Sequence, residues 1–307
     1  MIILKGIVLK STGSWYRVEL NDGNILKCRL RGKFKTKDLK TTNPIAVGDI
    51  VYVSVQEDEI GNIVEIGERR NCIIRKSTNL SKQTHLIAAN IDQSVLIVTL
   101  AFPRTSTGFI DRFLISAEAY NVPSIIVFNK TDLYDELSME KLYDLMSVYN
   151  SAGYQTLEVS AKTSFNMEKF KLLLKDKTSM LSGHSGVGKS HIINYLQPNL
   201  KIKTQDISDY HQKGKHTTTF SEMHELDFGG KIIDTPGIKE FGLVDFEAWE
   251  LGHWFPEFKK FIPNCKFSNC THYHEPNCAV REAVEKNIID NVRYENYLKI
   301  LNNVEEE

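Results

Sequence analysis

The chain has 307 residues, of which 41% are hydrophobic, and a formal net charge of −1. That length accommodates about two or three domains, and the near-neutral charge gives no argument for a nucleic-acid partner from net charge alone. The N-terminus lacks a signal-peptide pattern, and the apolar run Val95–Val98 is far shorter than the roughly 20 residues of a membrane span. We therefore expect a cytoplasmic protein that does not engage a membrane.

Residues 1–70 have the pattern of a small all-β domain. Short β-branched runs separated by turn residues occur at Ile2–Lys10, Trp15–Leu20, Ile25–Leu30, Asp49–Val55 and Asn62–Ile66. Such a set of strands predicts a β-barrel of the OB-fold type, which commonly binds nucleic acid on its open face. The alternative is an ordinary solvated β domain whose edge strand is protected by lysines.

Positive charge is concentrated between Lys27 and Lys40 within this domain. The residues that we expect to contact nucleic-acid phosphates are Lys27, Arg29, Arg31, Lys33 and Lys35.

From residue 71 to 243, short apolar strands alternate with helical stretches. The predicted strands are Ser94–Leu100, Ser124–Phe128, Thr156–Val159, Ser179–Ser182 and Lys231–Ile233. The predicted helices are Ile110–Tyr120, Ser138–Ser151, Met167–Lys175 and Lys189–Leu196. This alternation predicts an α/β fold with a mainly parallel sheet and helices on both faces.

A phosphate-binding loop lies between the fourth of these strands and the last helix. It comprises Gly183, His184, Ser185, Gly186, Val187, Gly188, Lys189 and Ser190. The glycines allow backbone N–H groups to approach phosphates at a helix N-terminus, Lys189 is expected to reach the β- and γ-phosphates, and Ser190 to ligate Mg²⁺.

Two turns upstream of the loop indicate which base is bound. Asn129-Lys130-Thr131-Asp132 follows a strand, and the Asp132 carboxylate can accept hydrogen bonds from N1–H and the exocyclic amine of guanine, which adenine lacks. Lys130 can lay its stem along the base. Ser160-Ala161-Lys162 follows the next strand, where a backbone N–H can meet guanine O6. Together the two turns predict guanine.

The γ-phosphate side follows the loop in the chain. Asp234, in Asp234-Thr235-Pro236-Gly237, is expected to hold Mg²⁺ through water, and the Gly237 N–H to sense the γ-phosphate. In the polar segment Lys213–Thr219 one of three threonines would ligate Mg²⁺, and we favour Thr218. Ile238 stands where many GTPases carry a water-orienting glutamine, which makes His216 the nearest catalytic candidate, although a histidine in such a segment more often makes a contact than acts as a catalyst.

The order of these motifs is rotated, because in an ordinary GTPase the guanine-reading turns follow the phosphate loop. The sequence therefore predicts a circularly permuted P-loop GTPase domain.

The last sixty or so residues are predicted to be helical, with helices at Phe246–Trp254, Ala279–Asn287 and Arg293–Asn302. They surround Cys265, Cys270, His272 and Cys278, a Cys₃His set suited to one tetrahedral structural Zn²⁺. His274 is a rival fourth ligand, and reduced buried cysteines are the alternative to a metal site.

These motifs resemble, nearly end to end, the bacterial ribosome small-subunit-dependent GTPase A family. Cys270–Ala279 is similar to the family's zinc segment and is the most specific piece. The resemblance implies an OB-fold at 1–70, a GTPase domain at 71–243 and a helical zinc domain at 244–307. It also implies His272 as a zinc ligand and His216 as a catalytic residue.

The resemblance further implies hydrolysis of GTP to GDP in late maturation of the small (30S) ribosomal subunit, with rRNA and the subunit as partners and activity stimulated by the subunit. We expect a monomer. The competing functions are a GTP-dependent RNA or ribosome clamp and a translation or RNA-modification GTPase without an assembly role.

Overall fold

The computed structural model describes residues 2–30, 43–55, 60–76, 84–201, 221–235 and 248–302. Five strands at the N-terminus form a barrel: β1 (Ile2–Ser11), β2 (Tyr16–Leu20), β3 (Ile25–Leu30), β4 (Ile50–Val55) and β5 (Ile60–Ile66). Their order is β1-β2-β3-β5-β4, and β1 also pairs with β4, which closes the barrel. A Cβ on Gly61 would lie 2.5 Å from Cys28 Sγ in the barrel core, so only glycine fits there. The predicted OB-like barrel is confirmed.

The second part is an α/β sheet, ordered β10-β9-β8-β11-β13-β12. Its strands are β8 (Gln93–Val98), β9 (Ser124–Phe128), β10 (Gln155–Glu158), β11 (Thr178–Ser182), β12 (Glu222–Glu225) and β13 (Lys231–Asp234). All neighbours pair in parallel except β12, which is antiparallel to β13. Parallel strands buried on both faces need apolar runs throughout, and every residue of β8 is buried.

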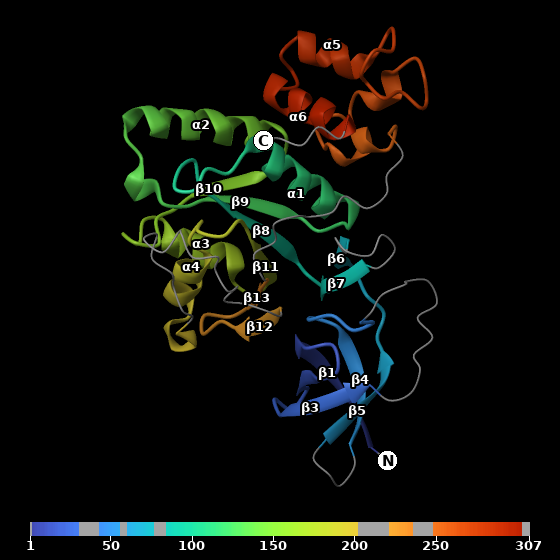
Figure 1. The fold of residues 1–307 in the computed structure, drawn as a ribbon, viewed down its shortest axis with the longest axis vertical. Coiled ribbons are helices and arrows are strands. Elements are labelled where there is room, and N and C mark those ends of the chain that lie inside the picture. The colour runs from blue at the N-terminus through green and yellow to red at the C-terminus, as the bar shows by residue number, and fades with distance from the viewer. Residues whose placement is uncertain are drawn as a thin grey trace.

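Helices cover both faces of this sheet (Figure 1). Those helices are α1 (Thr107–Ala119), α2 (Glu136–Ser151), α3 (Met167–Leu174) and α4 (Lys189–Leu196), with 3₁₀ turns η1 (Thr131–Leu133) and η2 (Pro198–Leu200). One core holds Phe113 of α1 and Leu142 of α2, while a separate core holds Phe170 of α3 and Ile192 of α4. The predicted two-faced α/β architecture is therefore confirmed.

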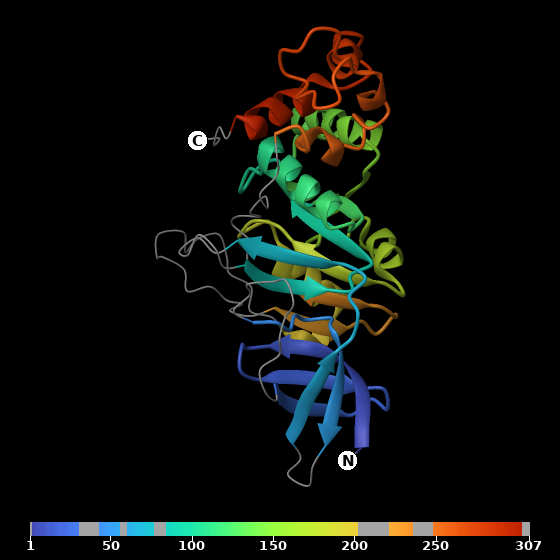
Figure 2. The same ribbon diagram turned by 90° about the vertical axis from the view of Figure 1, so that its right-hand side faces the viewer.

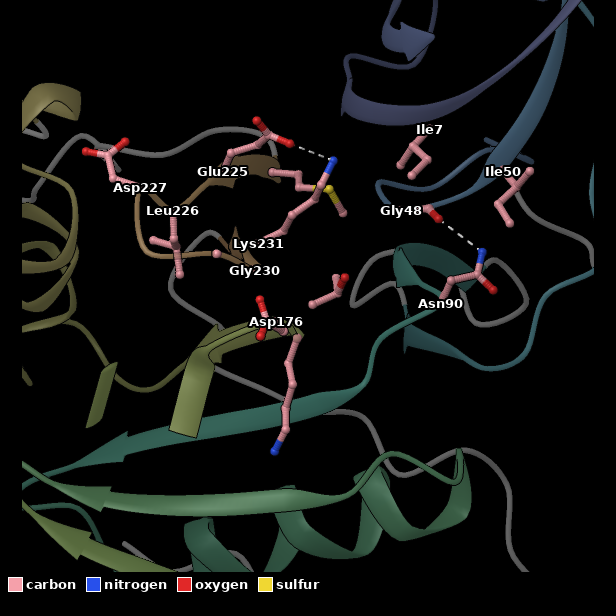
Figure 3. A pocket seen from close by; sticks show the side chains of 14 residues that line it. Ile7, Gly48, Ile50, Asn90, Asp176, Glu225, Leu226, Asp227, Gly230 and Lys231 are labelled. Atoms are coloured by element: carbon pink, nitrogen blue, oxygen red, sulfur yellow. Dashed lines mark hydrogen bonds and ion pairs between the residues drawn. The ribbon is translucent and has the colours of Figure 1, made fainter. Parts of the chain in front are cut away.

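The barrel continues the sheet of the α/β part. Lys10 of β1 pairs with Glu222 of β12, which joins the strands into one eleven-stranded sheet among the described residues. Figure 2 shows the barrel below the α/β sheet, with the unpredicted hairpin β6 (Cys72–Lys76) and β7 (Thr84–Ala89) beside the connection. A cavity of about 620 Å³ remains in this joint, lined from the barrel side by Ile7 and Ile50 (Figure 3).

The C-terminal part packs against α1 at the far end of the sheet from the barrel (Figure 1). It contains α5 (Ala279–Glu285), α6 (Asn291–Leu301) and the 3₁₀ turns η4 (Leu251–Trp254) and η5 (Ile262–Asn264). None of the helices that the structure describes is long and apolar enough to cross a membrane.

The predicted helix Phe246–Trp254 is wrong over its described residues, 248–254, which form a turn followed by η4. Two residues explain the difference. A Cβ on Gly252 would lie 2.8 Å from the ring of His272, so this position must remain a helix-disfavouring glycine. Pro256 in turn disfavours a helical conformation at Phe255, whose backbone is extended.

Candidate functional site

The phosphate-binding loop lies at the carboxyl end of β11, where α4 begins. Gly183, Gly186 and Gly188 have φ values of +146°, +86° and +95°, which side-chain-bearing residues rarely adopt. A Cβ on Gly183 would lie 2.3 Å from Ile97 O, and one on Gly188 would lie 2.4 Å from Asn129 Nδ2. The neighbouring strand β8 and the turn after β9 therefore lie in close contact with the loop. Glycine at these two positions makes that close approach possible. Val187 is buried beneath it, whereas Ser185 and Gly186 are exposed.

Lys189 folds back over this loop. Its Nζ donates to the carbonyls of Gly183 at 2.5 Å and His184 at 2.9 Å. Burial lowers the pKa of Lys189 to about 8, although the nearby Asp234 carboxylate raises it again in part. An ammonium group with so little water around it gains strongly from an arriving anion, as a phosphate-binding lysine requires.

The two described Mg²⁺ candidates lie at the same edge of the sheet. Ser190 is the second residue of α4, and Asp234 ends β13 opposite Leu181 of β11. Asp234 is 7% exposed, and the following Thr235 donates to Leu181 O at 2.9 Å. A hydroxyl and a carboxylate at one strand edge are oxygen ligands of the kind that Mg²⁺ prefers.

Asn129 links the guanine-reading turns to the phosphate loop. Its side chain donates to Val187 O at 2.8 Å and accepts from the Ala161 N–H at 3.3 Å. The side chain is nearly fully buried. The sequence placed Asn129 among the nucleotide contacts, and the structure gives it a bracing role that the four-residue pattern alone does not reveal.

Asp132 ends the first guanine turn and keeps free acceptor capacity. Its Oδ1 accepts from Ser160 Oγ at 2.6 Å, and Lys162 Nζ lies 3.9 Å from its Oδ2. Ser160 Oγ also accepts from the Thr163 N–H, which orients the hydroxyl toward the carboxylate. Because a carboxylate has about four lone-pair sites, Asp132 keeps acceptors for two donors of a guanine base.

The loop after β8, residues 99–106, was not recognised from the sequence. Lys130 Nζ donates to Phe102 O at 2.6 Å, and a Cβ on Gly186 would lie 3.2 Å from Pro103 Cδ. The loop therefore adjoins both the guanine turn and the phosphate loop. Its position follows from the strand order, since β8 lies between β11 and β9, but that order was not available from the sequence.

Four C-terminal side chains form a second candidate site. The ligand atoms of Cys265, Cys270, His272 and Cys278 all lie within 4.8 Å of one another. Cys265 Sγ is 4.0 Å from Cys278 Sγ, and His272 Nδ1 is 3.6 and 3.4 Å from these two sulfurs. A tetrahedral ion with metal–sulfur bonds of about 2.3 Å requires sulfur–sulfur edges of about 3.8 Å, so the set fits such a metal.

The surroundings favour His272 over His274 in this cluster. Burial lowers the pKa of His272 to about 4, which keeps the imidazole neutral, as a metal ligand must be. His274 is exposed. Burial also acts to raise the pKa of Glu275, but hydrogen bonds from Thr271 and from backbone N–H groups lower it to about 2. This carboxylate thereby fixes the turn that carries the ligands.

The remaining predicted site residues are only partly described. Lys27 and Arg29 lie exposed on β3, with Lys27 Nζ 4.1 Å from the centre of the Trp15 ring and Arg29 Nε donating to Asn62. The predicted residues outside the described part of the chain are Arg31, Lys33, Lys35, His216, Thr218, Gly237 and Ile238.

Known proteins match the whole chain. Residues 66–244 match the RsgA GTPase family model, and residues 5–63 match the RsgA N-terminal domain model. The chain is 52% identical over 303 residues to the small ribosomal subunit biogenesis GTPase RsgA 2 of Bacteroides thetaiotaomicron, covering 99% of this chain and 98% of that protein. It is 49% identical over 301 residues to the RsgA of Flavobacterium psychrophilum, covering 97% and 92% of the two chains.

Solved structures agree with these matches. The crystal structure of YjeQ from Thermotoga maritima is similar with a TM-score of 0.81 and 38% identity, covering 99% of each chain. The crystal structure of YloQ, described as a circularly permuted GTPase, has a TM-score of 0.75 and 29% identity, covering 99% of this chain and 95% of that one. The predicted circular permutation is confirmed, and the chain belongs to the RsgA GTPase family.

Proposed function

We propose that this protein hydrolyses GTP to GDP and phosphate in late maturation of the small (30S) ribosomal subunit, with activity that the subunit stimulates. The observation that carries the nucleotide part is the buried Asn129 side chain, which joins both guanine turns to the phosphate loop. The subunit part is supported by relatives about 50% identical over nearly the whole chain, whose name specifies small ribosomal subunit biogenesis.

Base choice in this proposal depends on Asp132. The carboxylate, held by Ser160, accepts from guanine N1–H and the exocyclic amine, while the Lys130 stem covers the base. The Ala161 N–H is the proposed donor to guanine O6. Adenine would leave the carboxylate without these two donors, which costs affinity.

In this proposal the phosphate-binding loop and Lys189 bind the phosphates of GTP. Backbone N–H groups of residues 183–190 and the N-terminus of α4 face the β-phosphate, and the Lys189 ammonium exchanges its two carbonyl partners for phosphate oxygens. Ser190, Thr218 and Asp234 are the proposed Mg²⁺ ligands, and bound Mg²⁺ would neutralise charge on the β- and γ-phosphates. The Gly237 N–H is the proposed γ-phosphate sensor.

Water activation requires a group other than residue 238, because the isoleucine side chain there has no polar atom. We propose His216 as that group, acting from the segment between the phosphate loop and β12. Without such a group in place the free protein would hydrolyse GTP slowly, which is consistent with a requirement for the subunit.

The other two sites would help to position the protein on the ribosomal subunit. Cys265, Cys270, His272 and Cys278 would hold one structural Zn²⁺, which organises the C-terminal turns and leaves no coordination position for chemistry. The proposed rRNA-phosphate contacts are Lys27, Arg29, Arg31, Lys33 and Lys35. We further propose domains at 1–70, 71–243 and 244–307, a monomeric state and a cytoplasmic location.

The test is GTP turnover by the purified protein alone, with purified small subunits, and with large subunits, using ATP as the control nucleotide. Stimulation of GTP hydrolysis by small subunits alone is the expected result. GTP binding without stimulated turnover would favour a GTP-dependent clamp, and normal small-subunit maturation in depleted cells would favour a GTPase without an assembly role.

A further inference from the structure

Helix α1 contacts the phosphate-binding loop at its first turn. The ring of Phe109 lies 3.7 Å, centre to centre, from the ring of His184, and Phe109 is 8% exposed. His184 O is one of the two carbonyls that hold Lys189 Nζ. The position of α1 thus influences the position of His184, whose carbonyl holds Lys189.

The same helix carries the docking site of the C-terminal part. Asp111 of α1 is fully buried, and its carboxylate accepts from Arg293 and, at 2.6 Å, from Asn296, both on α6. Ile115 of α1 belongs to the C-terminal hydrophobic core, while Phe113 belongs to a core of the GTPase sheet. Helix α1 is therefore shared between the two parts.

Arg293 is the centre of this contact. It is 1% exposed, its Nε donates to Glu257 Oε1 at 2.6 Å, and its guanidinium lies 4.6 Å from the centre of the Phe255 ring. Burial acts to lower the pKa of Arg293, but the carboxylates of Asp111 and Glu257 more than offset burial and raise it. A charge network this deeply buried holds its partners in one geometry, because any displacement leaves a charge without a partner.

Phe109 and Asp111 are two positions apart and so point to different faces of α1. They do not need to touch one another to be coupled, since a short helix packed on both sides moves as one body. A shift of α6 relative to the sheet would move Asp111, then α1, and with it the Phe109 ring against His184.

We propose that α1 transmits docking of the C-terminal part to the phosphate-binding loop, so that Asp111 and Phe109 are positioning residues for Lys189. The inference rests on the proposed function only in requiring that GTP binds at this loop. It adds a route through α1 by which a partner bound to the C-terminal part would alter the affinity of the protein for GTP.

The experiment is a double-mutant cycle on the full-length protein, read by titration with a fluorescent GTP analogue. Asp111→Asn removes the charge but keeps the size, and Phe109→Leu removes the ring that contacts His184. Each substitution is expected to weaken GTP binding by about two- to thirtyfold, the range for residues along a coupling route. The double variant is expected to bind no more weakly than the weaker single variant, because both changes interrupt one route.

Glu19→Gln is the matched control, since it removes an interdomain ion-pair partner at the barrel joint, away from the loop. It should leave GTP affinity unchanged. Asn296→Ala provides a milder second variant that removes one hydrogen bond to Asp111, in case Asp111→Asn does not fold. Metal content and circular dichroism of each variant would establish that the C-terminal part is intact.

Independent effects that multiply in the double variant would overturn the proposal, and so would unchanged affinity in folded Asp111→Asn protein. These outcomes are separate from failure of the proposed function. A protein that binds GTP and shows the non-additive cycle, yet is not stimulated by small subunits, would retain this inference and lose that function.

Discussion

The GTPase sheet is joined to the barrel and to the C-terminal part by physically different contacts. At the barrel, ion pairs connect strands through partly exposed side chains: Glu222, which is 21% exposed, bonds both Lys10 and Arg17. At the C-terminal part, Arg293 and Asp111 are 1% and 0% exposed. The first joint also retains a cavity of about 620 Å³, whereas the second is filled by aromatic rings around the guanidinium.

This difference determines where movement between the parts can occur. Partly solvated ion pairs contribute little to the free energy of unfolding and tolerate rearrangement. The barrel joint is therefore suited to small rotations. The C-terminal joint resists separation and should move together with α1.

Removal of the metal should disrupt the C-terminal part and leave the barrel intact. Structural Zn²⁺ in small domains supplies about 10 kcal/mol or more of folding free energy. Hydrogen exchange before and after treatment with a strong chelator should show fast exchange in α5 and α6 and unchanged exchange in β1–β5. Zinc addition should restore protection, and unaltered protection after confirmed metal loss would contradict a structural role.

Arg293→Met should be the most costly single substitution at either joint. It leaves the carboxylates of Asp111 and Glu257 buried without their cation, which costs about 3–5 kcal/mol of unfolding free energy. Urea unfolding would measure the loss, with Lys231→Met as the matched substitution at the barrel joint, where about 1 kcal/mol or less is expected. Equal losses would remove the contrast between the joints.

GTP affinity should fall at alkaline pH because Lys189, in the GTPase part between the two joints, loses its proton. Its pKa is about 8 in the free protein, and bound phosphates would raise it, so the charged form is favoured in the complex. Affinity is then fully present below pH 8 and is lost above it, approaching about tenfold per pH unit. Calorimetric titrations across this range provide the check. A flat profile up to pH 10 would mean that Lys189 does not titrate in the free protein.

Glu222→Gln should have the smallest effect. The substitution removes charge from two partly exposed ion pairs, for an expected loss of about 0–1 kcal/mol. Its loss should also shrink as salt is raised, since the Debye length falls from about 30 Å at 0.01 M to about 3 Å at 1 M. Unfolding of wild type and variant at the two salt concentrations tests this. A loss as large as that for Arg293→Met would show the barrel joint to be rigid.

Much of the fold could be predicted because the relevant signals are local. The glycines of the phosphate loop and the apolar strand before it specify a strand-to-helix turn within a few residues. The predicted strands of both sheets agree with the structure to within about two residues, apart from β6, β7 and β12, which were not predicted. β6 pairs with β7 and β12 with β13, each its neighbour in the chain, whereas the pairing of β12 with β1 joins distant segments that local sequence patterns do not reveal.

The parts of the site that escaped prediction depend on packing between distant segments. Nothing near Asn129 indicates that its side chain reaches Val187, 58 positions further along the chain. The buried contact of Arg293 with Asp111 spans 182 positions and joins two residue types that usually lie at the surface. The wrong helix at Phe246–Trp254 has a similar origin, because the need for glycine at position 252 comes from the distant His272 ring.

The base specificity of this GTPase is expected to depend on Asp132, and a change of specificity from GTP to XTP would reveal that dependence. Xanthine carries a carbonyl where guanine has its amine, so Asp132→Asn should replace an acceptor by a donor that matches it. Hydrolysis of GTP and XTP by wild type and variant, each with purified small subunits, would be measured. We predict that GTP hydrolysis by the variant falls by at least about a hundredfold, since two charge-assisted hydrogen bonds are involved, and that XTP hydrolysis rises. Undiminished hydrolysis of GTP by the variant would mean that Asp132 does not select guanine.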